Sequence, residues 1–160
     1  MQDFLIKDVP GKGKGLFAKK PFAKNEILFK FNGEKITREQ IVANNIPSNI
    51  VAGYLQINND LFLNIEQDAS VFVNHSCNPN TYVKIKYDTA FLLSYIPIKE
   101  GQEIVFDYST TSTDSLEDWS TSCKCSKFGC RKIISGFQYL SEKQKQQYMA
   151  AGIVPDFVWK

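Results

Sequence analysis

The sequence predicts a mainly β domain with a few helices, built from small antiparallel sheets. Its 160 residues are the length of one ordinary domain, and hydrophobic residues make up 43% of them, enough for a core without disulfide bonds. Short segments rich in Phe, Ile, Val, Leu or Tyr alternate with Gly, Asn, Asp or Pro over residues 1–106. Because the connections between these segments are short, antiparallel pairing is expected.

The strand candidates share apolar and aromatic residues and end at turn-forming residues. Natural turn points are Asn32-Gly33, Asn58-Asn59-Asp60 and Tyr87-Asp88-Thr89. The strands are expected at Phe4–Lys7, Gly15–Lys19, Glu26–Phe31, Tyr54–Ile57, Leu61–Asn64, Thr81–Lys86, Ala90–Tyr95 and Glu103–Phe106.

Two helices have start signals in the form of capping boxes. Thr37-Arg38-Glu39-Gln40 predicts a helix that ends near Asn44-Asn45. Ser141-Glu142-Lys143-Gln144 predicts a second helix that Gly152 terminates. The apolar side of the second helix would consist of Leu140, Tyr148 and Met149.

The segment Ser109–Ser122 is rich in Ser, Thr and Asp and predicts a loop that leads to a C-terminal appendage. The overlapping stretch Asp107–Asp118 holds four acidic residues and no Lys or Arg. Such a stretch would attract a basic substrate tail, but an ordinary solvated loop explains it equally well.

Charge and hydropathy exclude several classes of protein. The net charge of +2 is too small for strong binding to phosphate backbones, so no direct nucleic-acid binding is expected. No secretory signal begins the sequence and no run approaches ~18 apolar residues, so no membrane association is expected. We expect a soluble intracellular protein, with nucleus or cytoplasm and the oligomeric state left open.

The cysteines suggest a metal site. Cys123, Cys125 and Cys130 form a CxCx4C pattern, which suits a tetrahedral structural zinc. A structural zinc site has four ligands, and Cys77 is the remaining cysteine of the chain. The alternative is a set of free thiols, with Cys77 acting as a small buried hydrophobe.

His75 is the single histidine of the chain, so any Ser-His or Cys-His hydrolase would have to use it. In an extended strand His75 and Cys77 would share a face, which leaves a Cys-His nucleophile geometrically open. That reading competes with zinc for the same sulfur, and a zinc-bound thiolate is not a free nucleophile.

Four motifs together resemble the SET-domain lysine methyltransferases. Phe72–Asn80 reads FVNHSCNPN and is similar to the family's FxNHSCxPN, and Gly101–Tyr108 reads GQEIVFDY, similar to GEEITFDY. Gly13–Ala18 resembles the family's GxG-L-F-A opening, and Cys123–Cys130 resembles its post-SET zinc module. The resemblance implies a compact SET protein with a β-clip-like fold and a C-terminal pseudoknot. It divides the chain into a SET domain at residues 1–110 and a post-SET zinc-binding segment at 111–160, packed on the same core.

The resemblance also implies an activity, transfer of a methyl group from S-adenosylmethionine to the neutral amine of a lysine in a protein or peptide. Histone tails are the family's common substrates. Two departures from the family pattern argue against histones as the substrate. Position 71 is Val where the family usually has Arg, and the stretch between Leu61 and Phe72 is short. The alternative is a non-catalytic SET-like module that binds a lysine-bearing peptide or organises a complex.

Site residues follow from the same resemblance. Tyr108 corresponds to the catalytic tyrosine, Tyr54 lies beside the cofactor and lysine channel, and Asp107 supports the segment structurally. Phe106 occupies the position that sets the number of methyl groups, where Phe permits products beyond monomethyl-lysine. Residues implied in cofactor binding are Lys12, Gly13, Lys14, Gly15, Tyr54, Asn74, His75 and Tyr108. The zinc ligands implied are Cys77, Cys123, Cys125 and Cys130, and the tail aromatics Trp119, Phe128 and Phe137 are candidates for the wall of the lysine channel.

Overall fold

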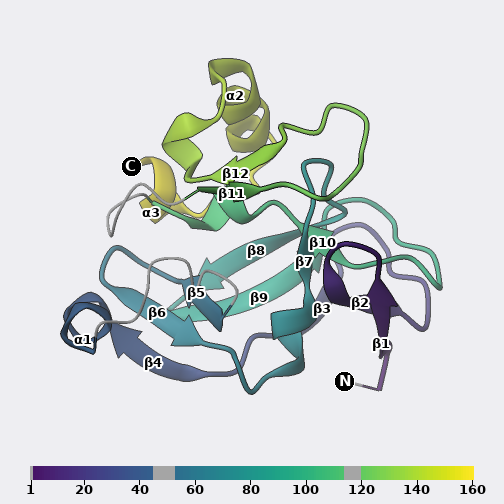
Figure 1. Ribbon diagram of the computed structural model, residues 1–160, viewed down its shortest axis with the longest axis horizontal. Coiled ribbons are helices and arrows are strands. Elements are labelled where there is room, and N and C mark those ends of the chain that lie inside the picture. The colour runs from purple at the N-terminus through teal and green to yellow at the C-terminus, as the bar shows by residue number, and fades with distance from the viewer. Residues whose placement is uncertain (1, 45–52, 114–119) are drawn as a thin grey trace.

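The computed structural model describes residues 2–44, 53–113 and 120–160. Within them the prediction of a mainly β fold with a few helices is confirmed, and the strands pair into small two- and three-stranded sheets (Figure 1). The antiparallel sheets are β1 (Phe4–Val9) with β2 (Gly13–Ala18), the three strands β3 (Ile27–Lys30), β9 (Thr89–Ser94) and β8 (Thr81–Lys86), and the three strands β4 (Glu34–Thr37), β6 (Leu61–Asn64) and β5 (Tyr54–Gln56).

The hydrophobic core lies where these sheets meet. Side chains from the β1–β2 hairpin, both three-stranded sheets and the segment before β10 form one continuous cluster. Phe31, Leu92 and Ile104 are almost completely buried in it. The aromatic ring of Tyr108 packs against the same cluster, so the core supports the candidate site directly.

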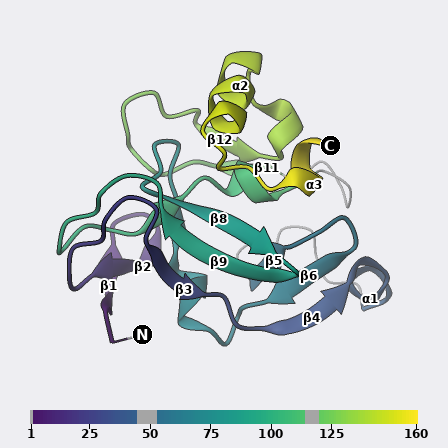
Figure 2. The ribbon, with the colours of Figure 1, turned by 180° about the vertical axis from the view of Figure 1, so that it is seen from behind.

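The C-terminal elements lie together on one side of the β8–β9 pair (Figures 1 and 2). Ile153 packs with Tyr82 and Leu93 of that pair, while Phe137, Leu140 and Val154 form a second small cluster. The elements of this part are β11 (Ser120–Ser122), β12 (Ile133–Ser135), the 3-10 helix η4 (Phe137–Tyr139), α2 (Glu142–Ala150) and α3 (Asp156–Trp159).

Both predicted helix starts are confirmed. Helix α1 (Arg38–Ala43) begins with the expected capping box, because the Thr37 hydroxyl accepts the Gln40 N–H and the Gln40 side chain accepts the Thr37 N–H. It ends at Asn44, while Asn45 lies outside the described residues. In α2 the Ser141 hydroxyl accepts the Gln144 N–H.

The end of α2 is also as expected, since Gly152 follows it with φ +66°. Its apolar side is smaller than predicted. Leu140, just before the helix, is buried and Tyr148 is half-buried, but Met149 is exposed, and no residue of α2 itself is buried.

One pair of strands departs from the antiparallel pairing seen in the other sheets of the described residues. Strands β7 (Asn74–His75) and β10 (Val105–Phe106) pair in parallel, with Val105 opposite Asn74 and Phe106 opposite His75. Parallel neighbours need a long crossover, and here the whole β8–β9 hairpin intervenes between them. This pair brings the segment after residue 103 against the segment 73–80, which is the contact that the expected pseudoknot requires.

The predicted loop Ser109–Ser122 is partly structured. Its start belongs to the 3-10 helix η3 (Tyr108–Thr111) and its end is β11, which pairs with β12. Much of the acidic stretch lies within residues 114–119, outside the described residues. Short elements that pair with distant partners carry little signal in their own sequence. The further elements that were not predicted are β4, β7, β12, η4, α3 and the 3-10 helix η2 (Ala69–Phe72).

Candidate active site and cysteine cluster

The parallel β7–β10 pair joins the two longest motifs of the sequence. Beyond the strands themselves, the Ser76 N–H donates to the Phe106 carbonyl at 3.0 Å. The Asn80 side chain fixes the register, because its Oδ1 accepts the Val105 N–H at 2.9 Å and its Nδ2 donates to the Glu103 carbonyl at 2.8 Å. The two motifs therefore form one rigid unit from which the site residues project.

Tyr108 stands at the start of η3, directly after β10. Its hydroxyl donates to the Val73 carbonyl at 2.8 Å, and its backbone N–H donates to Nδ1 of His75 at 3.2 Å. Its ring centroid lies 4.8 Å from that of Phe106 and 5.4 Å from that of His75. Burial, together with the nearby Glu103 carboxylate, raises the pKa of the Tyr108 phenol, so the hydroxyl stays neutral.

His75 is buried and serves as an uncharged bridge. Desolvation lowers its pKa to about 4 despite the neighbouring Asp107 carboxylate, so the imidazole is neutral near pH 7. Since Nδ1 accepts the Tyr108 N–H, the ring proton belongs on Nε2, which lies 3.4 Å from Cys77 Sγ. A Cys-His nucleophile is disfavoured, because the Cys77 sulfur lies within the cysteine cluster described below.

Glu103 gathers the residues expected around the cofactor. Its carboxylate accepts from Lys12 Nζ at 2.7 and 2.8 Å and from Asn74 Nδ2 at 2.9 Å. Asn74 Nδ2 also donates to the Lys14 carbonyl at 3.0 Å, which joins the N-terminal glycine motif to β7. The charge of Lys12 is thereby neutralised within the protein, and Glu103 is a residue that the sequence analysis did not single out.

The two glycines of the N-terminal motif have different surroundings. A Cβ on Gly15 would lie 2.6 Å from a Val9 methyl carbon and 2.9 Å from Asn74 Nδ2, so the protein itself fills that space. Gly13 has φ +77°, and a Cβ there would meet nothing within 4 Å. Gly13 is therefore the position at which a ligand has room to approach the backbone, while Gly15 is a packing glycine.

Tyr54 lies on β5, in a different sheet from Tyr108. Its hydroxyl accepts a long hydrogen bond of 3.4 Å from Asn64 Nδ2. Burial, followed by the Glu66 and Glu34 carboxylates, raises its pKa. Tyr108, Phe106, His75 and Asn74 thus form one connected group, and Tyr54 stands apart from them in its described hydrogen bonding.

The four cysteines converge as the zinc hypothesis requires. Their Sγ atoms all lie within 4.8 Å of one another, and Cys77 Sγ is 3.6 Å from Cys123 Sγ. Four thiolates bound to one zinc at ~2.3 Å would be separated by about 3.8 Å, so the donor set fits that ion. Cys77, whose part in the site could not be fixed from spacing alone, comes from the loop after β7 and joins three ligands 46 or more residues away.

Backbone N–H groups point at these sulfurs. Arg131 N–H donates to Cys77 Sγ at 3.5 Å and Lys132 N–H to Cys130 Sγ at 3.4 Å. Burial would raise the pKa of Cys125, but hydrogen bonds from backbone N–H groups and neighbouring thiols outweigh it and lower that pKa to about 6. Burial raises the pKa of Cys77 and of Cys123, so Cys125 is the member of the cluster for which thiolate, the form that binds metal, is favoured.

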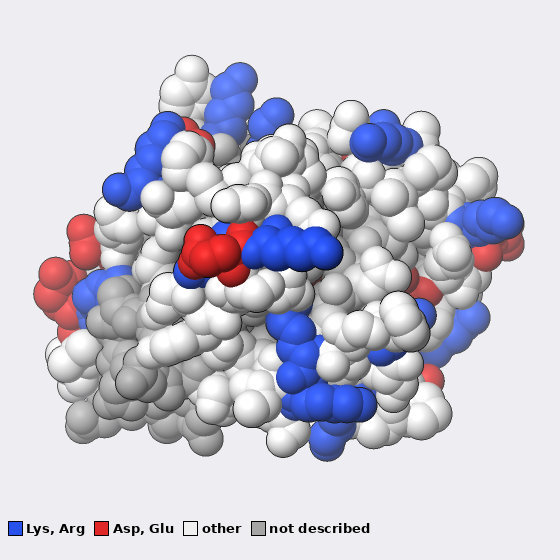
Figure 3. Space-filling model, turned by 90° about the horizontal axis from the view of Figure 1, so that it is seen from above, with Lys and Arg blue, Asp and Glu red and all other residues white. Residues whose placement is uncertain are grey.

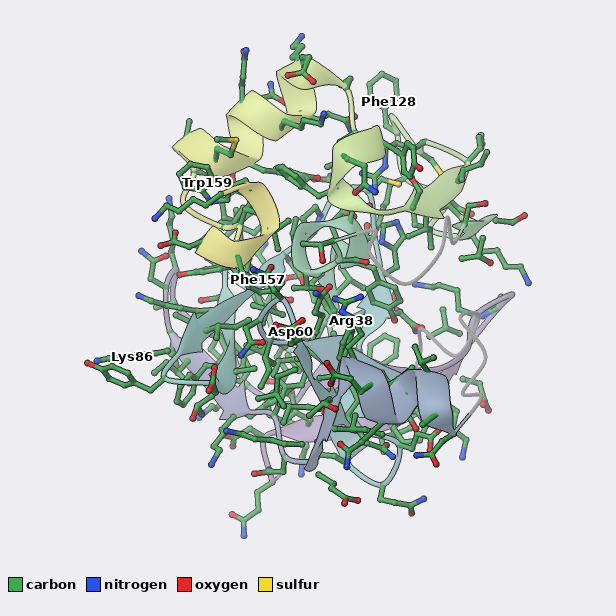
Figure 4. The ribbon with its side chains drawn as sticks, turned by 90° about the vertical axis from the view of Figure 1, so that its left-hand side faces the viewer. Arg38, Asp60, Lys86, Phe128, Phe157 and Trp159 are labelled. Atoms are coloured by element: carbon green, nitrogen blue, oxygen red, sulfur yellow. The ribbon has the colours of Figure 1, made fainter. Side chains whose placement is uncertain are left out.

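The tail aromatics separate into different environments. Phe128 is fully exposed at the tip of the cysteine loop and points away from the body (Figure 4), so it does not line an internal channel. Phe137 is buried and its N–H donates to the carbonyl of Ser112, just after η3, which keeps it a candidate for the channel wall. Trp119 lies outside the described residues.

Comparison with known proteins identifies the family. The SET domain model matches residues 13–109, which is more than half of the chain, so the chain belongs to the SET-domain family. The solved structure of KRYPTONITE in complex with mCHH DNA, H3(1-15) peptide and SAH superposes with a TM-score of 0.66 at 17% identity. It covers 82% of this chain and 29% of that one, and confirms the expected SET fold.

Several similar proteins are histone-lysine N-methyltransferases by name. An H3 lysine-36 specific enzyme of Candida albicans is 28% identical over 157 residues, covering 92% of this chain and 17% of its own. SETD1 of Drosophila melanogaster is 30% identical over 135 residues, covering 76% of this chain and 8% of its own. The chain therefore spans less than a quarter of the length of these curated relatives.

Proposed function

We propose that this chain is a protein-lysine N-methyltransferase that uses S-adenosylmethionine. The observation that carries the proposal is the setting of Tyr108, a neutral tyrosine held by the Val73 carbonyl and packed against Phe106 and His75. It occurs in a SET-domain chain whose relatives include named histone-lysine N-methyltransferases.

The residues around Gly13 suit a bound cofactor. Gly13 offers open space beside its backbone, and Lys124 of the cysteine loop approaches the neighbouring Gly11, whose added Cβ would lie 3.8 Å from Lys124 Cδ. S-adenosylmethionine would thus sit between the β1–β2 turn and the C-terminal segment, with Asn74 and His75 beside it. When bound, it supplies a methyl group on a positively charged sulfur.

In the proposed reaction the lone pair of a neutral lysine amine forms the N–CH3 bond. The S–CH3 bond breaks, its electron pair stays on sulfur, and the excess proton on the product amine passes to water. The protein aligns the reactants and excludes water, which lowers the pKa of the lysine. Tyr108 contributes an uncharged hydroxyl that orients the amine and does not remove a proton.

We also propose that residues 1–110 form the catalytic SET unit and that residues 111–160 form a post-SET segment held by one zinc. The convergence of Cys77 with Cys123, Cys125 and Cys130 supports this division, because zinc there would tie the segment to the loop after β7. The packing of Ile153 against Tyr82 and Leu93 supports a common core.

The proposed partner is a lysine-bearing protein or peptide, with histone tails as the first candidates. A KRYPTONITE structure contains an H3(1-15) peptide and DNA, but this chain covers 29% of that protein. Basic side chains stand in several separate groups on the face seen in Figure 3, some of them beside acidic ones. With a net charge of +2, this distribution favours a protein partner over nucleic acid.

No helix of the described residues is long and apolar enough to cross a membrane.

The test is methyl transfer from labelled S-adenosylmethionine to a panel of histones and to cell lysate, with wild-type protein and Tyr108→Phe. Label on lysine that disappears in the variant, while S-adenosylhomocysteine still binds, supports the enzyme. Peptide binding that is equal in both proteins, with no label in either, would instead identify a non-catalytic lysine-binding module.

A further inference from the structure

A buried carboxylate stands directly before the proposed catalytic tyrosine. The side chain of Asp107 has 0% exposed surface, and it caps η3 by accepting the Ser109 N–H at 3.1 Å. Tyr148, from helix α2, donates its hydroxyl to Asp107 Oδ2 at 2.9 Å. A carboxylate removed from water needs such donors, because an unpaired buried charge is strongly destabilising.

Arg131 is the main partner of this carboxylate. Its guanidinium donates from both terminal nitrogens to the two oxygens of Asp107, at 2.6 and 2.7 Å, and also to the Ser109 hydroxyl at 3.2 Å. This two-point geometry fixes the carboxylate in direction as well as position. With Asp107 fixed, the following residue, Tyr108, has little freedom in its backbone.

The backbone of Arg131 belongs to the cysteine cluster. Arg131 follows Cys130 directly, and its N–H donates to Cys77 Sγ at 3.5 Å. One residue therefore contacts the metal-binding sulfurs through its backbone and the carboxylate beside Tyr108 through its side chain. The sequence motifs assign no role to Arg131.

We propose that Arg131 is a positioning residue, which aligns Tyr108 through Asp107 and makes this alignment depend on an assembled cysteine cluster. The inference rests on the proposed function and extends it, because it names how the post-SET segment acts on the reacting tyrosine. Tyr148 of α2 donates to the same Asp107 carboxylate, so the packing of α2 on the body contributes to the alignment of Tyr108 as well.

His75 provides a reporter that does not require activity. It is the single histidine of the chain, and its ring touches each part of the network. Nδ1 accepts the Tyr108 N–H and lies 3.5 Å from Asp107 Oδ1, while Nε2 lies 3.4 Å from Cys77 Sγ. The ring ¹⁵N signals of labelled histidine would therefore come from His75 alone and respond to any shift of Tyr108 or Asp107.

The experiment compares zinc-loaded wild type, Arg131→Gln, Arg131→Lys and Tyr148→Phe. The matched control is Lys160→Gln, which removes the same charge from an exposed ion pair with Asp156. Four quantities are measured for each protein: zinc bound per chain, kcat, KM for a peptide that contains the lysine methylated by wild type, and the ring ¹⁵N shifts of His75.

We expect Arg131→Gln to keep its zinc and to shift the His75 signals. Its kcat should fall about tenfold to a hundredfold at nearly unchanged KM, because a misplaced catalytic group slows the reaction without weakening substrate binding. Arg131→Lys should recover part of kcat, and Tyr148→Phe, which removes a single hydroxyl, should lose less than Arg131→Gln. Lys160→Gln should match wild type in all four quantities.

Wild-type kcat and unshifted His75 signals in zinc-loaded Arg131→Gln would overturn the inference. So would activity that falls only in proportion to lost zinc, since Arg131 would then merely hold the metal loop. If wild type itself transfers no methyl group, the proposed function fails, and the His75 signals alone still decide whether Arg131 positions this segment. If Arg131→Gln does not fold, Tyr148→Phe with wild-type signals and kcat would refute the network.

Discussion

Replacing Glu103 by Gln tests whether one carboxylate organises the proposed cofactor site. Glu103 accepts hydrogen bonds from both Lys12 and Asn74, which are 91 and 29 residues away. Gln has the same shape but no charge, and its NH2 group would face one of these two donors. The Lys12 ion pair would be lost, and the one amide oxygen that remains would have to accept from both Lys12 and Asn74 without the negative charge that now strengthens these bonds.

The expected magnitude follows from the burial of the pair. The side chains of Lys12 and Glu103 are 14% and 21% exposed. Breaking a fully buried pair costs roughly 3–5 kcal/mol and an exposed one about 0–1 kcal/mol, so this pair should cost about 2 kcal/mol. In a domain of this size that corresponds to a Tm lower by roughly 4–8 °C. Cofactor affinity should fall about tenfold, because an uncharged acceptor holds Asn74 less firmly, and Asn74 in turn donates to the Lys14 carbonyl.

The assay is thermal unfolding without ligand, followed by calorimetric titration with S-adenosylhomocysteine. The matched control is Asp3→Asn, which breaks the ion pair with Lys20, where both side chains are nearly half exposed. Because exposed ion pairs contribute little to stability, that change should leave both Tm and binding nearly unaltered. Equal Tm values and equal Kd values for Glu103→Gln and Asp3→Asn would refute the idea that Glu103 organises the site.

Two further substitutions probe the site and the sheet beside it. Phe106→Tyr places a hydroxyl next to Tyr108, where a held water would obstruct further transfer, so mass spectrometry of the product should shift toward monomethyl-lysine. Unchanged di- or trimethyl product would show that Phe106 does not set the product. Gly33→Ala would put a Cβ 2.2 Å from the Asn64 carbonyl oxygen, so β4 and β6 must separate. We expect a loss of roughly 1–3 kcal/mol in denaturant unfolding, and a midpoint equal to wild type would contradict the close approach.

Local chemistry explains what could be predicted of the fold. The strands Leu61–Asn64 and Thr81–Lys86 were predicted with their observed bounds, because turn residues flank apolar runs on both sides. The helix starts at Thr37 and Ser141 depend on side-chain caps only three residues long. Each of these signals is complete within a few neighbouring residues.

The rest depends on contacts between distant residues. The parallel pairing of β7 and β10 involves two residues on each strand, too few to leave a periodic pattern. The partners of Asp107 lie 24 and 41 residues away, at Arg131 and Tyr148, and no local rule connects them. For the site, spacing predicted a three-cysteine metal motif, while the roles of Tyr108 and Asn74 came from family resemblance and remain predictions.

The C-terminal segment is attached to the body in two ways, and zinc removal should separate them. The cysteine cluster holds the segment through Cys77, whereas Ile153 packs against Tyr82 and Leu93 without any metal. Burial of a side chain such as Ile153 contributes about 1.5–3 kcal/mol, and this contribution survives chelation. We therefore expect a chelator to release the loop Cys123–Lys132 while α2 stays docked.

Hydrogen exchange with mass spectrometry distinguishes the two attachments. Peptides from residues 120–135 should exchange much faster after chelation, and peptides from residues 141–154 should change little, because local stability follows local contacts. Equal acceleration of both would mean that zinc alone holds the whole segment. No change in either would mean that the cysteines carry no structural metal. If the loop alone is released, Asp107 loses its bonds to Arg131 but keeps its hydrogen bond from Tyr148. Methyl transfer that persists without zinc then measures how much of the alignment of Tyr108 comes from α2.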